Sequence, residues 1–390
     1  MTRALKLGIG CIGAGGRGWI SQYAHLPRQG VRIVAACDTN PKALEEYRAR
    51  YGDVFCTADY RALLQRDDVG AVFVTTPDFL HETHAIAALK AGKDVYLEKP
   101  MAITLRGCDR VLRVAMECGR KLYVGHNMRH MRFVQKMRAL VQAGAIGEVK
   151  AAWCRHFIAY GGDAYFKDWH ADRTKTTSLL LQKAAHDIDV LHWLCGGTTR
   201  HVVAQGGLTL YDRITNRHAK SERGDATFRN ENWPPLSQKG LNPIINVEDI
   251  SHVLMQLDNG VFATYQQCHF TPDAWRNYTL IGSQGRIENV SEDEVVLWNK
   301  RCWHNPRGDR RFNVKGTTGQ HAGADPRIVR EFVRYVLEGG TTLTSPIAAR
   351  NSVATGFLAT QSLRNGSRPR TVPPVDAEVA LYFNSPISTQ

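Results

Sequence analysis

Residues 5–18 read LKLGIGCIGAGGRG, an apolar run that leads into a cluster of glycines. Two overlapping G-x-G-x-x-G triplets occur here, one starting at Gly8 and one at Gly13. A dinucleotide-binding turn of this kind works only where a strand precedes it and a helix opens within it, so that main-chain N–H groups meet a pyrophosphate. The second triplet leaves residues 5–12 as the strand and starts the helix near Gly18. We therefore favour the second triplet.

An acidic residue follows the glycines at a suitable distance. Asp38 directly follows the second apolar run, which spans residues 31–37. A carboxylate about 20 residues beyond the glycines hydrogen-bonds the adenosine ribose and repels a 2′-phosphate. Thr39 and Asn40 follow, so no arginine reverses this preference. The combination predicts NAD rather than NADP, and the alternative is a glycine-rich turn in some other doubly wound protein.

Along the first 125 residues, short apolar runs alternate with stretches whose apolar residues recur at helical spacing. This alternation is typical of βαβ units and predicts a parallel sheet. The predicted strands are 5–12, 31–37, 71–75, 94–97 and 121–124. The predicted helices are 42–50, 81–91 and 105–118, with a further amphipathic helix at 131–143.

The pattern changes after this helix. Longer β-like runs follow one another through tight turns such as Asp258-Asn259-Gly260, which predicts a mostly antiparallel sheet with one face free to meet a partner subunit. A single helix is predicted at 178–195. The polar stretch 212–246 has little periodicity, and loops of that length are usually functional or disordered, so we expect a lid or a subunit arm. The predicted strands are 149–157, 202–210, 249–257, 261–269, 278–281 and 286–290, and the last two helices are 326–337 and 347–364.

The composition of the 390 residues is that of a globular chain, with 43% apolar and 22% charged residues. No run approaches the roughly 18 apolar residues of a membrane span, and we find no leader, so we expect a cytoplasmic protein without membrane contact. The nine cysteines are scattered and lack a C-x-x-C pair, which favours reduced core residues over a metal site. The net charge of +13 favours an anionic partner. Because the basic residues are dispersed, we do not expect nucleic acid to be that partner.

Two segments that follow predicted strands carry polar side chains. One is TTPDFLH at 75–81, and the other is GKDVYLEKP at 92–100. Open α/β sheets bind ligands at the carboxyl ends of their strands. Pro100 keeps Lys99 out of the helical region, so Lys99 is placed to face a nicotinamide and a substrate hydroxyl. The alternative is a surface lysine at a strand end.

These segments resemble the Gfo/Idh/MocA family of sugar and inositol oxidoreductases. The resemblance covers nearly the whole chain. It implies an α/β fold with an N-terminal Rossmann domain, predicted at 1–126, and a C-terminal α/β domain with an open, mostly antiparallel sheet, predicted at 127–390. This division leaves open whether the C-terminal helices pack on the first domain. It also implies tightly held NAD(H) or NADP(H) and a homodimer or homotetramer formed through the open sheet. The motifs that carry the resemblance are the glycine loop, Thr76-Pro77-x-x-x-His81, Gly92-Lys93, Glu98-Lys99-Pro100, Gly144-x-x-Gly147-Glu148-Val149, Asn259-Gly260, Gly282-Ser283-Gln284-Gly285 and His321-x-Gly323-x-Asp325.

The predicted helix 178–195 carries the second group of candidates. At 3.6 residues per turn, Gln182, His186 and Asp189 share one face, and Lys183 lies one step round. The family pattern is Asp-x-x-x-His-x-x-Asp, and in this chain Gln182 replaces the first aspartate. An uncharged amide cannot stabilise an imidazolium as a carboxylate does, so more of the proton chemistry falls to Lys99, Lys183 and His186.

From these arguments we expect three groups of site residues and no metal ligand. The catalytic candidates are Lys99, His186 and Lys183. The cofactor-binding candidates are Gly13, Gly15, Gly16, Arg17, Gly18, Asp38, Thr76, Pro77, His81, Glu98, Lys99 and Asn127. The substrate-binding candidates, which combine aromatic rings with polar groups as sugar sites do, are Arg129, Tyr165, Trp169, His170, Arg173, Gln182, Asp189 and His321.

Three functions agree with this set. The first is an NAD(H)-dependent dehydrogenase or reductase acting on a secondary hydroxyl, at C3, of a sugar, polyol or glycoside. The second is a redox-neutral NAD+-dependent glycosidase that oxidises C3, eliminates the aglycone, adds water and reduces the ketone again. The net positive charge of the chain leaves room for an anionic sugar as its substrate. The third is a non-catalytic NAD-binding regulator. His186 with an ordinary pKa near 6.5 is suited to general base or acid, and a desolvated Lys99 could exchange roles with it.

Overall fold

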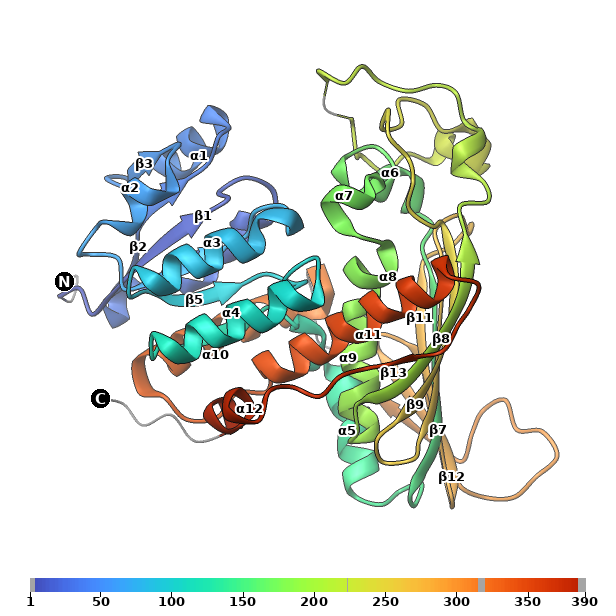
Figure 1. Ribbon diagram of the computed structural model, residues 1–390. Coiled ribbons are helices and arrows are strands. Elements are labelled where there is room, and N and C mark those ends of the chain that lie inside the picture. Colours follow the sequence, from blue (N-terminus) through green and yellow to red (C-terminus); the bar gives the residue numbers. More distant parts are fainter. Residues whose placement is uncertain (1–3, 223, 315–319, 385–390) are drawn as a thin grey trace. The chain divides into compact units, whose positions relative to one another are not determined.

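The computed structural model describes residues 4–222, 224–314 and 320–384 and divides the chain into two compact units (Figure 1). Unit 1 consists of the described residues of Met1–His130, Thr318–Arg350 and Pro374–Gln390. Unit 2 consists of those of Met131–Thr317 and Asn351–Pro373. The two C-terminal stretches of unit 1 show that the chain returns to the first unit after building most of the second.

Unit 1 contains a six-stranded parallel sheet in the order β3-β2-β1-β4-β5-β6. The strand order reverses between β1 and β4, and this is the point at which doubly wound sheets bind ligands. The sequence-based prediction of a Rossmann sheet is confirmed. Its strands are β1 (Leu7–Ile12), β2 (Val31–Cys37), β3 (Phe55–Thr57), β4 (Ala71–Val74), β5 (Asp94–Leu97) and β6 (Leu122–Val124).

Side chains cap the N-termini of two helices of unit 1. Asn40 caps one helix by accepting a hydrogen bond from the Lys42 N–H, and Thr104 caps another through the Gly107 N–H. The helix that opens within the glycine loop is a 3-10 helix. It starts at Gly16 rather than near Gly18 as predicted. The helices are η1 (Gly16–Ala24), η2 (Pro27–Gln29), α1 (Pro41–Tyr51), α2 (Tyr60–Leu64), α3 (Asp78–Lys90), α4 (Leu105–Glu117), η3 (Asn127–His130), η8 (Gln320–Gly323), α10 (Ala324–Glu338) and α12 (Ala377–Asn384).

An aromatic cluster attaches α10 to the parallel sheet. Phe332 on α10 contacts Phe73 edge-on, with ring centroids 5.3 Å apart, and lies 5.5 Å from Tyr96 and 5.7 Å from Tyr123. Phe73 and Tyr96, on neighbouring strands, stack at 4.6 Å. All four side chains are buried. A helix from the far end of the sequence thus completes the core of the nucleotide-binding fold.

Unit 2 contains a nine-stranded sheet in the order β14-β13-β12-β11-β7-β10-β9-β8-β15. The pair β7–β10 is parallel and the other pairs are antiparallel, which confirms the predicted mostly antiparallel sheet. Its strands are β7 (Val149–Phe157), β8 (Thr199–Gly207), β9 (Ile250–Leu257), β10 (Phe262–Cys268), β11 (Trp275–Gly282), β12 (Gly285–Ser291), β13 (Glu294–Trp298), β14 (Arg310–Asn313) and β15 (Arg370–Thr371).

Helices of unit 2 cover one face of this sheet, and residues on β7 alternate between buried and partly exposed positions accordingly (Figure 1). The single helix predicted at 178–195 is wrong, because the structure divides it into α8 and α9 at Lys183. The helices are α5 (Arg132–Gln142), α6 (Gly161–Tyr165), η4 (Trp169–Ala171), α7 (Arg173–Thr176), α8 (Leu179–Gln182), α9 (Ala184–Cys195), η5 (Tyr211–Arg213), η6 (Asn230–Asn232), η7 (Pro235–Ser237) and α11 (Pro346–Arg364), which continues from unit 1 into unit 2.

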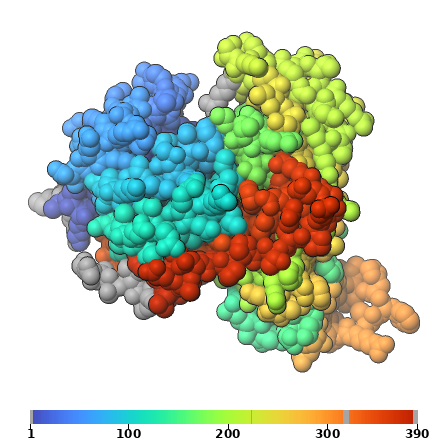
Figure 2. Space-filling model, viewed as in Figure 1, coloured from blue at the N-terminus to red at the C-terminus, as the bar shows by residue number. Residues whose placement is uncertain are grey.

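The described part of the polar stretch 212–246 forms a long irregular loop with short turns, as its weak periodicity predicts. It is tied to the segment before α8, because the Asn242 N–H donates to Phe166 O at 2.7 Å and the Asn246 N–H donates to Ala171 O at 3.1 Å. Figure 2 shows this loop in yellow-green at one end of unit 2, and the β13–β14 loop in orange at the other. The lid or arm role stays a prediction.

All nine cysteines are free thiols in the structure. Within residues 4–222, 224–314 and 320–384, no helix has the length and hydrophobicity that crossing a membrane requires. The same part of the chain contains no cluster of histidine, cysteine and acidic side chains that could hold a metal ion.

We predict that Phe332→Ala lowers the free energy of unfolding by about 3–5 kcal/mol, because it leaves a cavity among three other buried rings. Chemical denaturation of the purified protein measures this change. The matched control is Leu337→Ala on the same helix, where the side chain is 36% exposed and the loss should stay below about 1 kcal/mol. Equal losses in the two variants would show that α10 does not complete the core.

Candidate functional site

The glycine loop of unit 1 is shaped for close approach of a ligand. Gly13 has φ +89°, and a Cβ there would lie 2.7 Å from Thr76 N. A Cβ on Gly18 would lie 2.3 Å from Gly13 O, so the start of η1 packs directly on the loop. A Cβ on Gly16 would meet no atom within 4 Å, so the loop surface is open there. Close packing below and open space above are what a pyrophosphate-binding loop requires.

Asp38 lies beside this loop at the end of β2. Its Oδ2 accepts a hydrogen bond from the Gly15 N–H at 2.7 Å, and its Oδ1 accepts one from the Asn40 N–H at 2.8 Å. These two bonds fix the carboxylate at the edge of the loop. The loop and the carboxylate therefore fit the diphosphate and ribose of a dinucleotide, with Gly13, Gly15, Gly16 and Gly18 as the predicted cradle.

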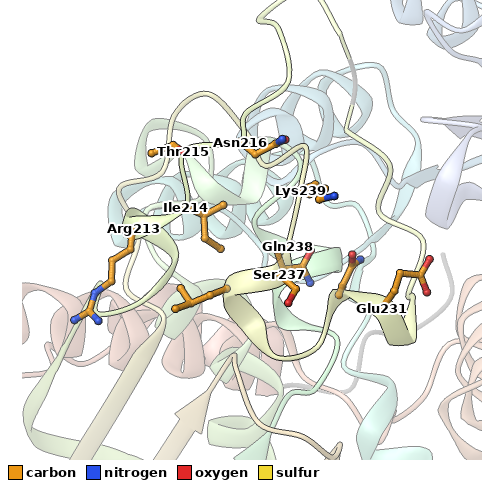
Figure 3. A pocket seen from close by; sticks show the side chains of 10 residues that line it. Arg213, Ile214, Thr215, Asn216, Glu231, Ser237, Gln238 and Lys239 are labelled. Atoms are coloured by element: carbon orange, nitrogen blue, oxygen red, sulfur yellow. The ribbon is translucent and has the colours of Figure 1, made fainter.

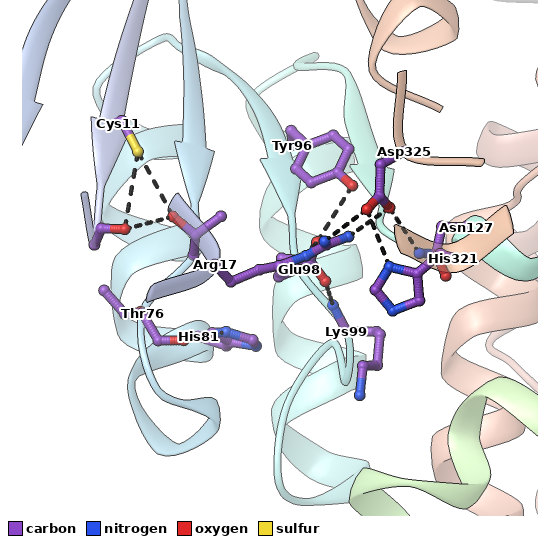
Figure 4. Close-up of polar contacts among 12 residues, drawn as sticks. Cys11, Arg17, Thr76, His81, Tyr96, Glu98, Lys99, Asn127, His321 and Asp325 are labelled. Carbon is purple, nitrogen blue, oxygen red and sulfur yellow. Dashed lines mark hydrogen bonds and ion pairs between the residues drawn. The ribbon is translucent and has the colours of Figure 1, made fainter. Parts of the chain in front are cut away.

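Arg17, which we predicted as a cofactor-binding residue, forms ion pairs with two carboxylates of unit 1. Its Nε lies 2.9 Å from Glu98 Oε1, and its two terminal nitrogens pair with both carboxylate oxygens of Asp325 at 2.8 and 2.9 Å (Figure 4). Bidentate pairs of this kind are strong and directional. Arg17 thus joins the glycine loop, the end of β5 and the first turn of α10.

The network around Asp325 includes two more predicted site residues. Asn127 Nδ2 donates to Asp325 Oδ1 at 2.8 Å, and His321 Nδ1 lies 3.0 Å from Asp325 Oδ2. Burial alone would raise the pKa of Asp325, but hydrogen bonds from Arg17 and His321 hold it below its ordinary value. Asn127 and His321, predicted as cofactor and substrate ligands, are both supports of this carboxylate in the structure.

His81 joins two segments that carry predicted site residues. Its Nδ1 lies 2.7 Å from Pro100 O and its Nε2 lies 2.7 Å from Thr76 O, and the ring is buried. The Thr76-Pro77 segment is thereby fixed against the segment that carries Lys99. The Lys99 N–H donates to Glu98 Oε2 at 3.1 Å, and in Figure 4 the Lys99 side chain extends away from that carboxylate.

Arg129 is buried in unit 1 and donates from Nη1 to Leu343 O at 2.8 Å. Its predicted contact with an anionic substrate stays a prediction. Arg173, also predicted for substrate, is exposed in unit 2 and donates to Asn246 O at 2.6 and 3.1 Å. In the structure this arginine anchors the long loop.

Lys183 lies on one side of two neighbouring tyrosine rings in unit 2, whose centroids are 6.3 Å apart. Its Nζ lies 5.4 Å from the ring centroid of Tyr160 and 5.4 Å from that of Tyr165. Burial alone would lower the pKa of Lys183, but the two phenols outweigh burial and raise it. Lys183 is therefore an ammonium, and its charge acts on the two tyrosines.

Tyr165 also joins the other predicted aromatic residues of this segment. It meets His170 edge-on, with ring centroids 5.3 Å apart, and His170 stacks on Trp169 at 3.7 Å. His170 is fixed by Asp168, whose Oδ1 lies 2.6 Å from His170 Nδ1. Four predicted residues, Tyr165, Trp169, His170 and Lys183, thus form one polar-aromatic cluster. Gln182, His186 and Asp189, the remaining candidates from this region, are buried on α8 and α9.

A buried ion pair that interacts electrostatically with Lys183 was not predicted from the sequence. Arg276 Nε is 2.8 Å from Asp187 Oδ1, and His156 Nδ1 is 3.1 Å from Asp187 Oδ2. Tyr278 donates its hydroxyl to the same carboxylate. Burial and the nearby Arg276 lower the pKa of His156 to about 3, so this ring is neutral. Strand register places Arg276 opposite His156, and the packing of α9 on the sheet adds Asp187, so no local sequence signal identifies the group.

Residues of the long loop line an open pocket of about 650 Å³ in unit 2 (Figure 3). None of its lining residues was predicted for the site. The lining residues are Arg213, Ile214, Thr215, Asn216, Glu231, Asn232, Leu236, Ser237, Gln238 and Lys239.

We predict that Asp325→Asn lowers the free energy of unfolding by about 3 kcal/mol at neutral pH, because it breaks a buried ion pair with Arg17. Since the pKa of Asp325 is lower in the folded than in the unfolded state, the carboxylate stabilises the protein above about pH 4 and loses this effect as the pH falls. Denaturation at successive pH values should therefore show the gap between variant and wild type closing in acid. Asp67→Asn, an exposed site in the same unit, is the control, and a gap that persists in acid would contradict the role of the charge.

Comparison with known proteins gives two matches to family profiles. Residues 7–126 match the profile described as "Oxidoreductase family, NAD-binding Rossmann fold". Residues 138–372 match the one described as "Oxidoreductase family, C-terminal alpha/beta domain". Both profiles describe Gfo/Idh/MocA proteins.

Relatives and solved structures agree with this assignment. A 1-carboxy-3-chloro-3,4-dihydroxycyclohexa-1,5-diene dehydrogenase of Comamonas testosteroni is 31% identical over 192 residues, which are 48% of this chain and 47% of that protein. An inositol 2-dehydrogenase of Pseudomonas fluorescens is 33% identical over 199 residues, which are 49% of this chain and 55% of that protein. The matches therefore span about half the length of these relatives.

A levoglucosan dehydrogenase, solved with NADH and L-sorbose, has the same fold, with a TM-score of 0.78 at 19% identity. The similarity covers 95% of this chain and 99% of that chain. Since the two family profiles together span most of the sequence, the chain belongs to the Gfo/Idh/MocA family of oxidoreductases.

Proposed function

We propose that this protein is an NAD(H)-dependent dehydrogenase that transfers hydride to or from a secondary hydroxyl, at C3, of a sugar, polyol or glycoside. The polar-aromatic cluster of Tyr165, Trp169, His170 and Lys183 is the observation that carries this proposal. Aromatic rings pack on the C–H faces of a carbohydrate while the charged and polar groups bind its hydroxyls. The named relatives that act on inositol, and the similar levoglucosan dehydrogenase structure, support the same substrate class.

In this proposal unit 1 holds the dinucleotide. The glycine loop receives the diphosphate, and Asp38 binds the ribose hydroxyls while its charge repels a 2′-phosphate, so NAD is preferred over NADP. The Thr76-Pro77 segment and Lys99 contact the nicotinamide half, and Arg17, Glu98 and His81 keep these segments in position. Bound NAD+ supplies the hydride acceptor.

The substrate proton is handled by side chains of this chain. Lys183 and His186 are the candidates in unit 2, and Lys99 polarises the hydroxyl oxygen. Gln182 and Asp189 bind neighbouring hydroxyls. Positioned acids and bases of this kind typically contribute about 10²- to 10⁴-fold to rate.

A redox-neutral glycosidase is the second candidate. Oxidation at C3 acidifies the C2 proton, so elimination, hydration and reduction at one ring need several proton-transfer groups. The cluster around Lys183 offers more than one, because Tyr160 and Tyr165 both face its ammonium. This observation favours the glycosidase over a non-catalytic regulator, which has no use for such groups.

We propose that two or four copies assemble through the open face of the nine-stranded sheet. Leu254 on β9 and Phe262 on β10 are 62% and 63% exposed. Phe262 pairs with Gln256, two residues from Leu254, so the two apolar side chains are diagonal neighbours on one face. Two large apolar side chains exposed side by side on an open sheet are suited to contact with a second copy of the chain.

Purified protein given NAD+ and a panel of inositols, free sugars and chromogenic glycosides should produce NADH from at least one carbohydrate. Lys183→Met should lower that rate at least about 10²-fold, because it removes the charge that serves proton transfer. Release of aglycone over many turnovers without net NADH would instead establish the glycosidase. Binding of NAD+ with neither product across the panel would favour the regulator.

A separate binding experiment tests the preference for NAD over NADP. Asp38→Ser should weaken NAD+ binding by about ten-fold or more, since a hydrogen-bonded charge is lost, and should narrow the preference over NADP+. Binding calorimetry measures both constants. An unchanged ratio of the dissociation constants for NAD+ and NADP+ would contradict the proposed role of Asp38.

Replacing both Leu254 and Phe262 by lysine should reduce the molar mass in solution toward that of one chain, because like charges and lost apolar area oppose assembly. Light scattering during size-exclusion chromatography measures this. The control is Leu381→Lys on α12, where the side chain is 70% exposed and the mass should not change. Retention of the wild-type mass by the double variant would exclude this face.

A further inference from the structure

The ammonium of Lys183 is paired with phenols, because the neighbouring carboxylate is already engaged. Asp187, one helical turn along α9, is bound by Arg276 at 2.8 Å, by His156 at 3.1 Å and by the hydroxyl of Tyr278. The Nζ of Lys183 lies instead 5.4 Å from the ring centroids of both Tyr160 and Tyr165, and these two phenols raise the pKa of Lys183. A phenolate is therefore the natural counter-ion for this ammonium.

The two tyrosines differ in access. Tyr165 is 8% exposed, and its ring is held edge-on at 5.3 Å from both His170 and His269. Tyr160 follows β7, at the start of α6, and is only half-buried. Tyr160 is thus the more exposed residue of the pair.

The pKa values of the two tyrosines also differ, and the difference again favours Tyr160. The charge of Lys183 lowers the pKa of Tyr160 below its ordinary value, and this effect exceeds the opposing effect of burial. Burial raises the pKa of Tyr165 despite the same ammonium. Of the two, Tyr160 is the one whose ionised form is favoured.

The other charged groups around this pair do not compete for the proton. Arg276 is compensated by Asp187. Burial, with Arg276, keeps His156 neutral. Burial, with His156 and Lys183, lowers the pKa of His269 well below its ordinary value, so this ring is neutral too. The largest charge effect on the pKa of Tyr160 therefore comes from Lys183, and Arg276 lowers this pKa further by more than Asp187 raises it.

We propose that Tyr160 is the catalytic base of this protein and that Lys183 is a positioning residue that acts through it. The inference rests on the proposed dehydrogenase function and names the acceptor atom. The Tyr160 oxygen takes the O–H proton of the substrate as its C–O bond becomes a carbonyl, and the hydride leaves the same carbon, with its electron pair, for bound NAD+. In the reverse direction the phenol returns the proton to the alkoxide.

The first test is the pH profile of kcat/KM with the best carbohydrate substrate. Tyr160→Phe should lower kcat about 10²- to 10⁴-fold with little change in KM, and should abolish the acidic limb of the profile. Lys183→Met should move that limb to higher pH, because Tyr160 loses the charge that favours its ionised form. Tyr165→Phe, the matched control, should keep the limb at its wild-type position. An acidic limb that survives in Tyr160→Phe would overturn the proposal.

The second test needs no turnover. Titration of the tyrosinate ultraviolet band in the protein without cofactor should show one tyrosine ionising below the ordinary value of about 10. This step should vanish in Tyr160→Phe, persist in Tyr165→Phe and move to higher pH in Lys183→Met. Its absence from the wild type would overturn the proposal. Its presence in a protein that oxidises no carbohydrate would reject the proposed dehydrogenase function while leaving the Tyr160–Lys183 pair established.

Discussion

The guanidinium of Arg17 joins three segments of unit 1 that are far apart in the sequence. One is the glycine loop that carries Arg17 itself, the second is the end of β5 through Glu98, and the third is the first turn of α10 through Asp325. The positions of the glycine loop, the segment before Lys99 and helix α10 therefore depend on one another through this guanidinium. An arginine in a phosphate-binding loop is in this case a structural clamp, because two carboxylates already use its donors.

Two positively charged side chains of unit 2 have different kinds of partner. Arg276 has a carboxylate partner in Asp187, whereas Lys183 has aromatic hydroxyls. A carboxylate beside Lys183 would neutralise the ammonium and remove its influence on a phenol. By directing Asp187 toward the sheet, the fold keeps the charge of Lys183 available at the partly exposed Tyr160.

Local sequence patterns predicted those features that depend on neighbours in the chain. The Rossmann strands, the glycine loop with Asp38, and most strands of the second sheet follow from runs of apolar residues and from turns. Short elements such as β3, α2 and β14 were missed, because a few residues carry little periodicity. The break at Lys183 was missed because the apolar spacing continues across it. Asp187, Arg276 and His156 could not be grouped from the sequence, since β7 and β11 bring Arg276 opposite His156 only through sheet register.

The return of α10 and α12 to unit 1 has a consequence for the newly synthesised chain. Translation delivers the six parallel strands first, yet Phe332 and Asp325, which complete the core and the clamp, emerge only after most of unit 2. Until then, the sheet exposes the apolar surface that α10 later covers, and exposed surface of this kind promotes aggregation. Unit 2 is thus inserted into the nucleotide-binding unit, and the first unit to leave the ribosome is the last to be completed.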